Sequence, residues 1–428
     1  PESKVQCISA NSFVLGELRS SVQHVSSLSS SARRASLVEL RTALILPCCK
    51  MLAIYHCGGG SRLPFLMEPV ALPPHHVLGA FDQVNVCAPM VRYSKLPFRA
   101  LVSHYNTHIT TTPMILAAEF SRHPQARDAE FSTNQAERGT FRLPSQRTHR
   151  DVVFRGSLVC QLAASEAGPL ADAAELVSPF VDGIDLNCGC PQPWAYAEHI
   201  GSYLLRQPET VRDMVRTVKD RLGHSYCVSV KIRIDADLRR TDTLVRNALH
   251  AGASLITIHG RTMHESSASD PVHLDAVKFA VDCANACGLQ TARGTSPHDA
   301  WVWAEDGGSG GCAPCIVNGD IWTNDDAVEW RRYTGARGAM SARGLLANPA
   351  LFAGETRTPP EAIARFVDHA MSWGLPTSFL QYVCSTDPSR HLAYMLEDRM
   401  PSRAESIYFN SLASPASILD WLADAGYV

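Results

Sequence analysis

The segment from Asp185 to Pro191 places two cysteines and a proline directly after a short apolar run. Pro191 fixes its own backbone angle and restrains Cys190 towards an extended conformation. The thiol of Cys190 is therefore held at one place where a predicted strand ends. That suits a reactive group better than a packing residue, although most cysteines in folded proteins are structural. The ends of the other predicted strands favour the reactive interpretation.

Polar side chains also end other apolar runs. Gln161, Lys231 and His259 each follow a short strand-like segment. A cation and an imidazole that project into one pocket can hold an electron-rich ring and stabilise negative charge as it develops. Asn318-Gly319-Asp320 and Ala342-Arg343-Gly344 form two small turns, the second at the start of a predicted helix, where backbone N–H groups bind phosphate. We expect a phosphorylated cofactor with a flat ring, and flavin mononucleotide (FMN) is the simplest candidate.

Eight short β-branched runs supply these strand ends, and such runs are typical of strands buried in a parallel sheet. We predict strands at Val84–Cys87, His108–Thr112, Ser157–Cys160, Gly183–Leu186, Val228–Val230, Leu255–Ile258, Cys315–Val317 and Gly338–Ala342. We predict helices between them at Leu170–Phe180, Pro208–Leu222, Thr241–Ala251, Leu274–Ala286 and Asp325–Tyr333. This alternation predicts an α/β fold, a (β/α)8 TIM barrel with its active site where the strands end. A doubly wound sheet is the alternative, but it would place a glycine-rich turn after the first strand, and Ala88-Pro89-Met90 provides none.

The 428 residues are enough for one barrel with additional segments. We expect residues 1–80 to be an extension of low order, 81–355 the catalytic barrel and 356–428 a helical domain. The extension is rich in serine and poor in acidic residues, which fits an organellar transit segment, a disordered extension or a wrongly assigned gene start. Its apolar stretch is too short to span a bilayer. A polar insertion at 290–314 precedes the seventh strand.

The formal net charge of −3 does not indicate a nucleic-acid binder, so any such role depends on local basic patches. We interpret the 14 cysteines as reduced thiols of an intracellular protein, because no regular disulfide framework is visible. A zinc site built from Cys283, Cys287, Cys312 and Cys315 is the weaker alternative, since four ligands need a closed tetrahedral arrangement. We therefore expect no metal.

From Val84 to Phe352 the chain resembles the tRNA-dihydrouridine synthases, which are FMN-dependent barrels. The most specific match is Asn187-Cys188-Gly189-Cys190-Pro191, which is similar to the family's signature around its catalytic cysteine. The following Gln192, Trp194, Ala195 and Ala197 resemble the eukaryotic subgroup that modifies positions 20a and 20b of the D-loop. The tail segment from His391 to Glu397 also resembles that subgroup.

The resemblance implies a role for each matched position. Cys190 would be the catalytic proton donor, and Asn187 and Arg261 would orient the target uracil. The residues implied to bind FMN are Pro89, Met90, Val91, Gln161, Lys231, His259, Asn318, Gly319, Asp320, Ala342, Arg343 and Gly344.

The activity implied by the resemblance is reduction of the C5–C6 bond of D-loop uridines by NADPH through FMN. Hydride would pass from flavin N5 to C6 and a proton from Cys190 to C5. The uracil must be splayed out of the folded RNA to enter the pocket. Two alternatives stay open: an FMN barrel dehydrogenase that acts on a free pyrimidine, and a tRNA-binding factor without catalysis.

The remaining expectations concern partners and location. We expect tRNA as the substrate, a monomer without a protein partner or membrane association, and a cytoplasmic or nuclear location. A mitochondrial location follows if the amino-terminal segment is a transit peptide. The candidate RNA contacts are two groups of arginines: Arg122, Arg127, Arg138, Arg142, Arg147, Arg150 and Arg155, and Arg390, Arg399 and Arg403 in the tail.

Overall fold

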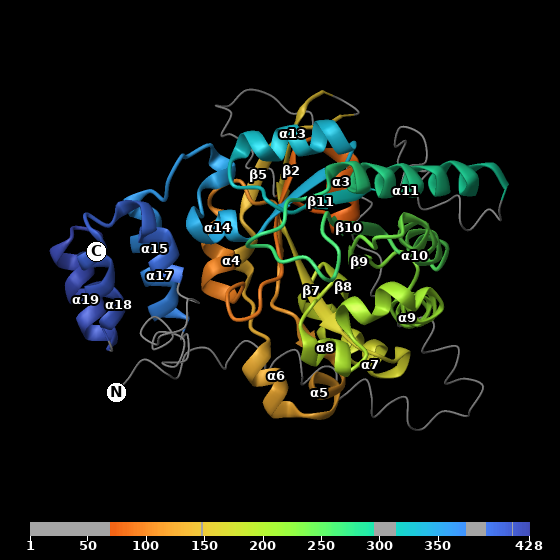
Figure 1. The fold of residues 1–428 in the computed structure, drawn as a ribbon, viewed down its shortest axis with the longest axis horizontal. Helices are drawn as coiled ribbons and strands as arrows, with labels where there is room; N and C mark the ends of the chain where they lie inside the picture. Colours follow the sequence, from red (N-terminus) through yellow and green to blue (C-terminus); the bar gives the residue numbers. More distant parts are fainter. Residues whose placement is uncertain (1–68, 147–148, 295–313, 374–390, 413) are drawn as a thin grey trace, which may run out of the picture. The chain divides into compact units, whose positions relative to one another are not determined.

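A computed structural model describes residues 69–146, 149–294, 314–373, 391–412 and 414–428. All of the described residues belong to one compact unit, Met67–Val428. This unit contains a closed barrel of parallel strands (Figure 1). Its strands are β2 (Val84–Cys87), β3 (Ile109–Thr111), β7 (Ser157–Ala163), β8 (Gly183–Cys188), β9 (Val228–Arg233), β10 (Leu255–His259), β11 (Cys315–Asn318) and β12 (Gly338–Ser341).

The barrel closes because its first strand pairs with its last. Successive strands pair in parallel from β2 to β3, then from β3 to β7 and onward to β12. β12 then pairs with β2, with Met340 beside Val86. A ninth, short strand, β4 (Ile115–Leu116), adds to β7. The predicted (β/α)8 barrel is confirmed, and all eight predicted strands are present.

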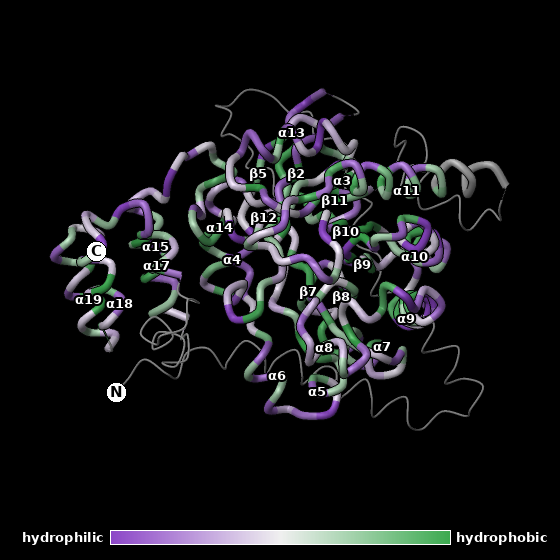
Figure 2. Tube along the Cα trace, in the orientation of Figure 1, coloured by the Kyte–Doolittle hydropathy of each residue, from purple (hydrophilic) through white to green (hydrophobic). Residues whose placement is uncertain are grey.

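Helices cover the outside of the barrel. In α9, Val211, Met214, Val215 and Val218 are buried, a spacing that puts one apolar stripe against the strands. Figure 2 shows hydrophobic residues on the barrel strands and hydrophilic residues along the outer parts of α9 and α10. The helices that accompany the barrel are α4 (Leu96–Ser103), α5 (Ala117–Arg122), α6 (Pro124–Glu130), α7 (Ala167–Val177), α8 (Pro193–Ala197), α9 (Pro208–Leu222), α10 (Leu238–His250), α11 (Leu274–Gly294), α13 (Asn324–Thr334) and α14 (Arg343–Ala347). No helix within the described ranges is long and apolar enough to cross a membrane.

A small sheet that was not predicted covers the amino-terminal end of the barrel. β5 (Thr140–Pro144) and β6 (Asp151–Arg155) pair as an antiparallel hairpin, and β1 (Val70–Ala71) adds to β6. Phe141 and Phe154 from the hairpin pack with residues at the starts of the barrel strands, such as Val84, Leu255 and Ile316. The sheet therefore closes the end opposite to the loops that follow the strands.

The folded unit begins earlier than residue 81. Helix α3 (Pro74–Ala80) buries Val77 and Leu78 completely, in the same cluster as the hairpin. Residues 70–80, which we expected to belong to an extension of low order, therefore form part of the barrel's closed end. The rest of that extension, including the serine-rich segment, lies outside the described residues.

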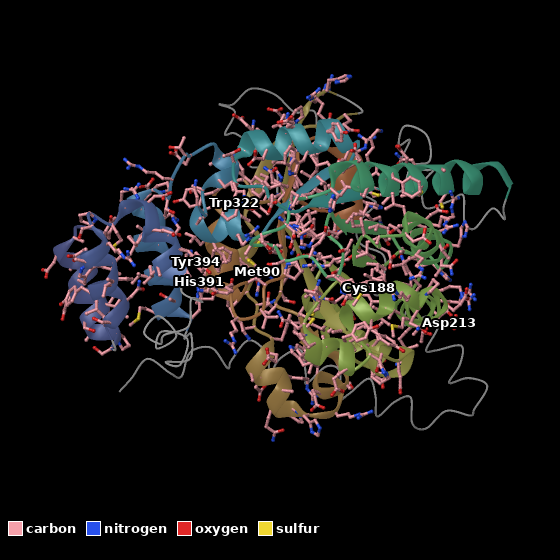
Figure 3. All side chains as sticks on the ribbon, viewed as in Figure 1. Met90, Cys188, Asp213, Trp322, His391 and Tyr394 are labelled. Atoms are coloured by element: carbon pink, nitrogen blue, oxygen red, sulfur yellow. The ribbon has the colours of Figure 1, made fainter. Side chains whose placement is uncertain are left out.

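The carboxyl-terminal region is helical, as predicted. It comprises α15 (Pro360–Ser372), α17 (His391–Leu396), the short 3-10 helix η5 (Glu397–Arg399), α18 (Arg403–Ser411) and α19 (Pro415–Asp424). His391 joins it to the barrel, because its Nε2 lies 2.8 Å from the backbone oxygen of Tyr93. His391 and Tyr394 are labelled on α17 in Figure 3. Nearly all of the insertion predicted at 290–314, and residues 374–390 of the predicted helical domain, lie outside the described residues.

Candidate active site

The loop that carries Cys190 follows β8 and is folded by Asn187. The side-chain oxygen of Asn187 accepts hydrogen bonds from the backbone N–H groups of Gly189 and Cys190, at 3.0 and 2.9 Å. The backbone oxygen of Cys190 accepts a third from the N–H of Ser202, at 2.9 Å. Cys190 is partly exposed, whereas Cys188 is fully buried. The loop therefore presents one thiol and hides the other.

Four predicted site residues project into the barrel from four adjacent strands. Gln161, Asn187, Lys231 and His259 lie on β7, β8, β9 and β10. Their neighbours along each strand, such as Cys160 and Cys188, belong to the apolar cluster beneath the helices. Because side chains alternate between the two faces of a strand, the four residues share the inner face. Asn187 lies directly beside Lys231 in the sheet register. The structure thus brings these four residues together at the carboxyl-terminal end of the barrel.

Two of these residues have strongly shifted ionisation. Burial, with the nearby charge of Arg233, lowers the pKa of Lys231 to about 8. Burial and the surrounding cations, Lys231 first among them, lower the pKa of His259 well below its usual value. Nε2 of His259 lies 3.3 Å from Nη1 of Arg261, which can only donate, so this nitrogen is the acceptor. At pH 7 His259 is therefore a neutral imidazole that carries its proton on Nδ1.

A cavity of about 120 Å³ opens at the carboxyl-terminal ends of β10, β11 and β12. One water molecule requires roughly 10–15 Å³, so the cavity can hold a group of several atoms. Its lining consists of His259, Arg261, Ser267, Asn318, Gly319, Asp320, Ile321, Trp322, Met340, Ala342, Arg343 and Gly344. Eight of the predicted site residues are in this lining, so both predicted turns face one cavity.

The charges around the cavity favour an anion. Asp320 accepts a hydrogen bond from Arg343 at 2.7 Å and another from Arg261. Two guanidinium groups share one carboxylate, which leaves one positive charge in excess. Ala342, at the start of α14, places no side-chain cap on the first turn of the helix, so a ligand can accept from its N–H groups. A phosphate group fits this donor set.

Glycine is required where α14 begins. A Cβ atom on Gly344 would lie 2.2 Å from the backbone oxygen of Ile321 and 2.7 Å from Oγ of Ser341. The first turn of α14 therefore packs against the loop after β11 with no room for a side chain. This contact fixes the distance between the two turns that line the cavity.

Four predicted residues lie elsewhere or have other contacts. Pro89, Met90 and Val91 are not among the described residues that line the cavity; they lie in the turn after β2, whose Ala88 N–H donates to Ser341 of β12. Met90 is labelled in Figure 3. Arg261 is 2% exposed, and its guanidinium nitrogens contact the backbone oxygen of Asp270, the ring of His259 and the carboxylate of Asp320. These contacts hold the cavity wall in place.

Sequence reasoning missed several residues that shape the site. Arg233 donates to the backbone oxygens of Gly189, at 3.1 Å, and Thr262, at 2.7 Å, and so joins the Cys190 loop to the loop after β10. The guanidinium of Arg343 lies 4.9 Å from the ring centre of Trp322. Period-two spacing could have identified Arg233, because it follows Lys231 on the same face of the predicted strand.

Part of the predicted arginine cluster is structural. Arg138 and Arg155 both form ion pairs with Asp182, and Arg127 donates to the backbone of Phe120. Arg142 is exposed on β5, at the end of the barrel away from Cys190. The tail residue Arg399 donates to the backbone of Thr358. Arg147 and Arg390 lie outside the described residues, and Arg122, Arg150 and Arg403 stay predicted RNA contacts.

Comparison with known proteins agrees with the geometry. The model of the family described as dihydrouridine synthase (Dus) matches residues 86–282 and 311–391. A mouse protein (Mus musculus) is 42% identical over 342 residues, which cover 80% of this chain and 88% of that protein. A human protein is 42% identical over 342 residues, covering 80% and 90%, and one from Schizosaccharomyces pombe is 40% identical over 339 residues, covering 79% and 86%. The S. pombe protein is named tRNA-dihydrouridine(20a/20b) synthase [NAD(P)+], and the mouse and human proteins carry the same name with the suffix "-like".

Proposed function

This chain belongs to the dihydrouridine synthase family, and from that premise we propose that it reduces uridines at positions 20a and 20b of tRNA to dihydrouridine. The names of its relatives support the substrate and the use of NAD(P)H. The observation that carries the proposal is the position of Cys190, a partly exposed thiol at the end of β8 on the same rim as Lys231, His259 and the anion-binding cavity.

We propose FMN as the cofactor, because the cavity offers what its phosphate requires. Arg343 and the N–H groups at the start of α14 would bind the phosphate, and Lys231 and Gln161 would bind the ring system. FMN, when bound, supplies hydride for reduction of the C5–C6 bond. The positive charge of Lys231 favours negative charge on the ring beside it. Because His259 on the adjacent strand is neutral, it adds no second full positive charge beside Lys231 and the flavin ring.

Cys190 would supply the proton. Reduction at C6 of the uracil leaves negative charge that an acid must neutralise at C5, and the Sγ–H of Cys190 can give that proton. The bonds from Asn187 to the backbone of Gly189 and Cys190 fix where the thiol lies. The side-chain amide of Asn187 lies at the same rim and would contact the uracil.

The tRNA must present an unstacked uridine, and aromatic side chains beside the thiol suit that requirement. Helix α8 begins three residues after Cys190, and its Trp194 and Tyr196 are 47% and 39% exposed, while Ala195 between them is fully buried. Exposed aromatic rings stack with unpaired bases, at roughly 1–3 kcal/mol per base. We propose that α8 contacts nucleotides next to the target and that the helical tail docks the rest of the tRNA.

The test replaces each cysteine of the loop separately. We expect Cys190→Ala to keep bound yellow flavin and its reduction by NADPH but to lose dihydrouridine formation by roughly 100-fold or more. Cys188→Ala is the matched control, because Cys188 lies two residues away but is fully buried beneath the helices. Dihydrouridine is mapped in tRNA from cells that lack the gene, with and without each variant.

Three results would contradict the proposal. Unchanged modification by Cys190→Ala would remove the thiol from the mechanism. Turnover of free uracil or dihydroorotate, with none on tRNA, would indicate a dehydrogenase of free pyrimidines. Binding of tRNA without oxidation of NADPH would indicate a factor without catalysis.

A further inference from the structure

Asp185 is a buried carboxyl group that none of the roles above uses. It lies on β8 two residues before Asn187, so both side chains project to the inside of the barrel. Its side chain is 4% exposed. In the sheet register it lies between Gln161 of β7 and Ser229 of β9. A carboxyl group buried this deeply requires hydrogen-bonded partners.

A chain of hydrogen bonds runs from Asp185 to the backbone of Cys190. Gln161 donates from Nε2 to Oδ2 of Asp185 at 2.8 Å. Asn187 donates from Nδ2 to Oε1 of Gln161, also at 2.8 Å. The N–H groups of Gly189 and Cys190 then donate to Oδ1 of Asn187, at 3.0 and 2.9 Å. Two side-chain amides thus separate the carboxyl group from the loop that carries the thiol.

The direction of this chain is set at both of its ends, by Asp185 and by the backbone N–H groups of Gly189 and Cys190. Each amide has one end that donates and one that accepts. Because Oδ2 of Asp185 only accepts, the NH2 group of Gln161 must face it, and the oxygen of Gln161 must face Asn187. The NH2 group of Asn187 therefore points to Gln161, and its oxygen points to the loop. If both amides were reversed, the NH2 group of Asn187 would face two backbone N–H groups.

The same direction is kept when Asp185 is protonated on Oδ1. Burial raises the pKa of Asp185, against the opposing effect of its bonds to Gln161 and Ser229. Oδ1 lies 2.6 Å from Oγ of Ser229, which also lies 3.3 Å from the backbone oxygen of Ile184. If Asp185 is protonated, Oδ1 can donate to the Ser229 hydroxyl, which then donates to Ile184. In both states Oδ2 accepts from Gln161.

We propose that Asp185 is a positioning residue: it fixes the direction of the Gln161 amide, supports that of Asn187 together with the N–H groups of the loop, and thereby holds Cys190 in its reactive position. Its effect on the reaction rests on the proposed function, whereas its effect on the Cys190 loop does not. The same amides would contact the flavin ring and the uracil, so their direction also decides which of their groups face those ligands.

The test compares three variants of the full-length protein. Asp185→Leu has the same branched shape but no acceptor, so the Gln161 amide loses its fixed partner and Asn187 keeps only its bonds to the loop. Asp185→Asn can keep an oxygen towards Gln161 and turn its NH2 group to Ser229. Ser229→Ala is the matched control, because it removes a buried bond of the same carboxyl group but leaves the chain to Cys190 intact.

Two readouts are measured for each variant. The first is the rate at which iodoacetamide alkylates Cys190, determined by mass spectrometry of its peptide. The second is the single-turnover rate at which tRNA reoxidises the reduced flavin, compared with the rate at which NADPH reduces it.

We expect Asp185→Leu to change the alkylation rate by about tenfold. We expect it to slow the tRNA step roughly 100-fold, because a misplaced catalytic group can cost this much. The rate at which NADPH reduces the flavin should change far less. Asp185→Asn and Ser229→Ala should stay within about threefold of the wild type in both readouts.

Three outcomes would overturn the proposal. The first is that Asp185→Leu matches the wild type in both readouts. The second is that Asp185→Asn loses as much activity as Asp185→Leu, which would mean that the charge of Asp185 matters and the direction of the amides does not. The third is that Asp185→Leu slows reduction of the flavin by NADPH as much as its reoxidation by tRNA. If Asp185→Leu does not fold, Asp185→Ala is judged by the same outcomes. If the wild type forms no dihydrouridine, the proposed function fails, but the alkylation rates still decide whether Asp185 positions the loop.

Discussion

At the scale of single residues, the barrel holds a lysine where its charge is unfavourable for folding. Burial and the charge of Arg233 lower the pKa of Lys231 from 10.5 to about 8. Below pH 8 both the folded and the unfolded chain carry the charge, and the folded chain bears the cost of desolvation. Between pH 8 and 10.5 the unfolded chain binds more protons, so the stability of the protein rises with pH in this window.

We therefore expect Lys231→Met to be more stable than the wild type at pH 7, by on the order of 1–3 kcal/mol, because Lys231 keeps some exposure to solvent. The advantage should shrink as the pH rises from 8 to 10.5. Urea unfolding of the flavin-free protein between pH 7 and 10 measures it. Lys278→Met is the control, because Lys278 is 48% exposed in a surface ion pair with Asp282. Equal stability of Lys231→Met and wild type at pH 7 would contradict the expectation.

The sequence was sufficient for most of the candidate site but not for Asp185. Gln161, Lys231 and His259 could be predicted because each is a polar residue that ends an apolar run. Asp185 lies inside such a run, and its partners Gln161 and Ser229 are 24 and 44 residues away along the chain. Only the strand register brings these three residues together, so a local pattern could not reveal their bonds.

At the scale of elements, the predicted and missed strands differ in what stabilises them. The eight barrel strands are short runs rich in β-branched residues and are almost entirely buried on both faces, so composition alone identifies them. The β5–β6 hairpin carries Arg142, Asp151 and Arg155 among its apolar residues and therefore appeared to be a loop rich in arginine. Its stability comes from Phe141 and Phe154, which pack against the barrel's amino-terminal end, a contact between segments far apart in sequence.

The Cys190 loop depends on a second element, the 3-10 helix η3 (Gly201–Arg206). Gly201 has φ +65°, and a Cβ atom there would lie 2.7 Å from the backbone oxygen of Cys190 and 2.8 Å from its Cβ. We expect Gly201→Ala to destabilise the protein by about 1–2 kcal/mol through the left-handed conformation and to push the Cys190 loop out of place. Dihydrouridine formation should then fall by roughly tenfold or more, while NADPH still reduces the flavin.

A second glycine provides the control for this prediction. Gly223 has φ +97°, but a Cβ atom there would meet nothing within 4 Å. Gly223→Ala should therefore lower the free energy of unfolding by a similar amount without affecting the thiol. If the two variants lose activity equally, backbone strain explains the loss and the contact with Cys190 does not. Thermal unfolding and the single-turnover rate with tRNA are measured for both.

At the scale of the whole molecule, the helical tail is joined to the barrel beside the active site. His391 of α17 lies among the rings of Tyr93, Phe98 and Phe366, at centroid distances of 5.0, 5.1 and 5.0 Å. Burial lowers the pKa of His391 to about 4, so the ring is neutral at pH 7. Because a carbonyl oxygen only accepts, Nε2 carries the proton and donates to Tyr93. Tyr93 belongs to the turn after β2, so the tail and the rim of the barrel share this contact.

If the tail docks the tRNA, this bond should affect tRNA binding more than flavin chemistry. His391→Phe keeps the ring packing but removes the hydrogen bond from His391 to the oxygen of Tyr93, at a cost of about 1–2 kcal/mol. We expect the KM for tRNA to rise roughly five- to tenfold, while the rate of flavin reduction by NADPH stays near that of the wild type. His250→Phe, at the exposed end of α10, should leave both unchanged. A slower flavin reduction with an unchanged KM for tRNA would mean that His391 serves the turn after β2 and not the docking of tRNA.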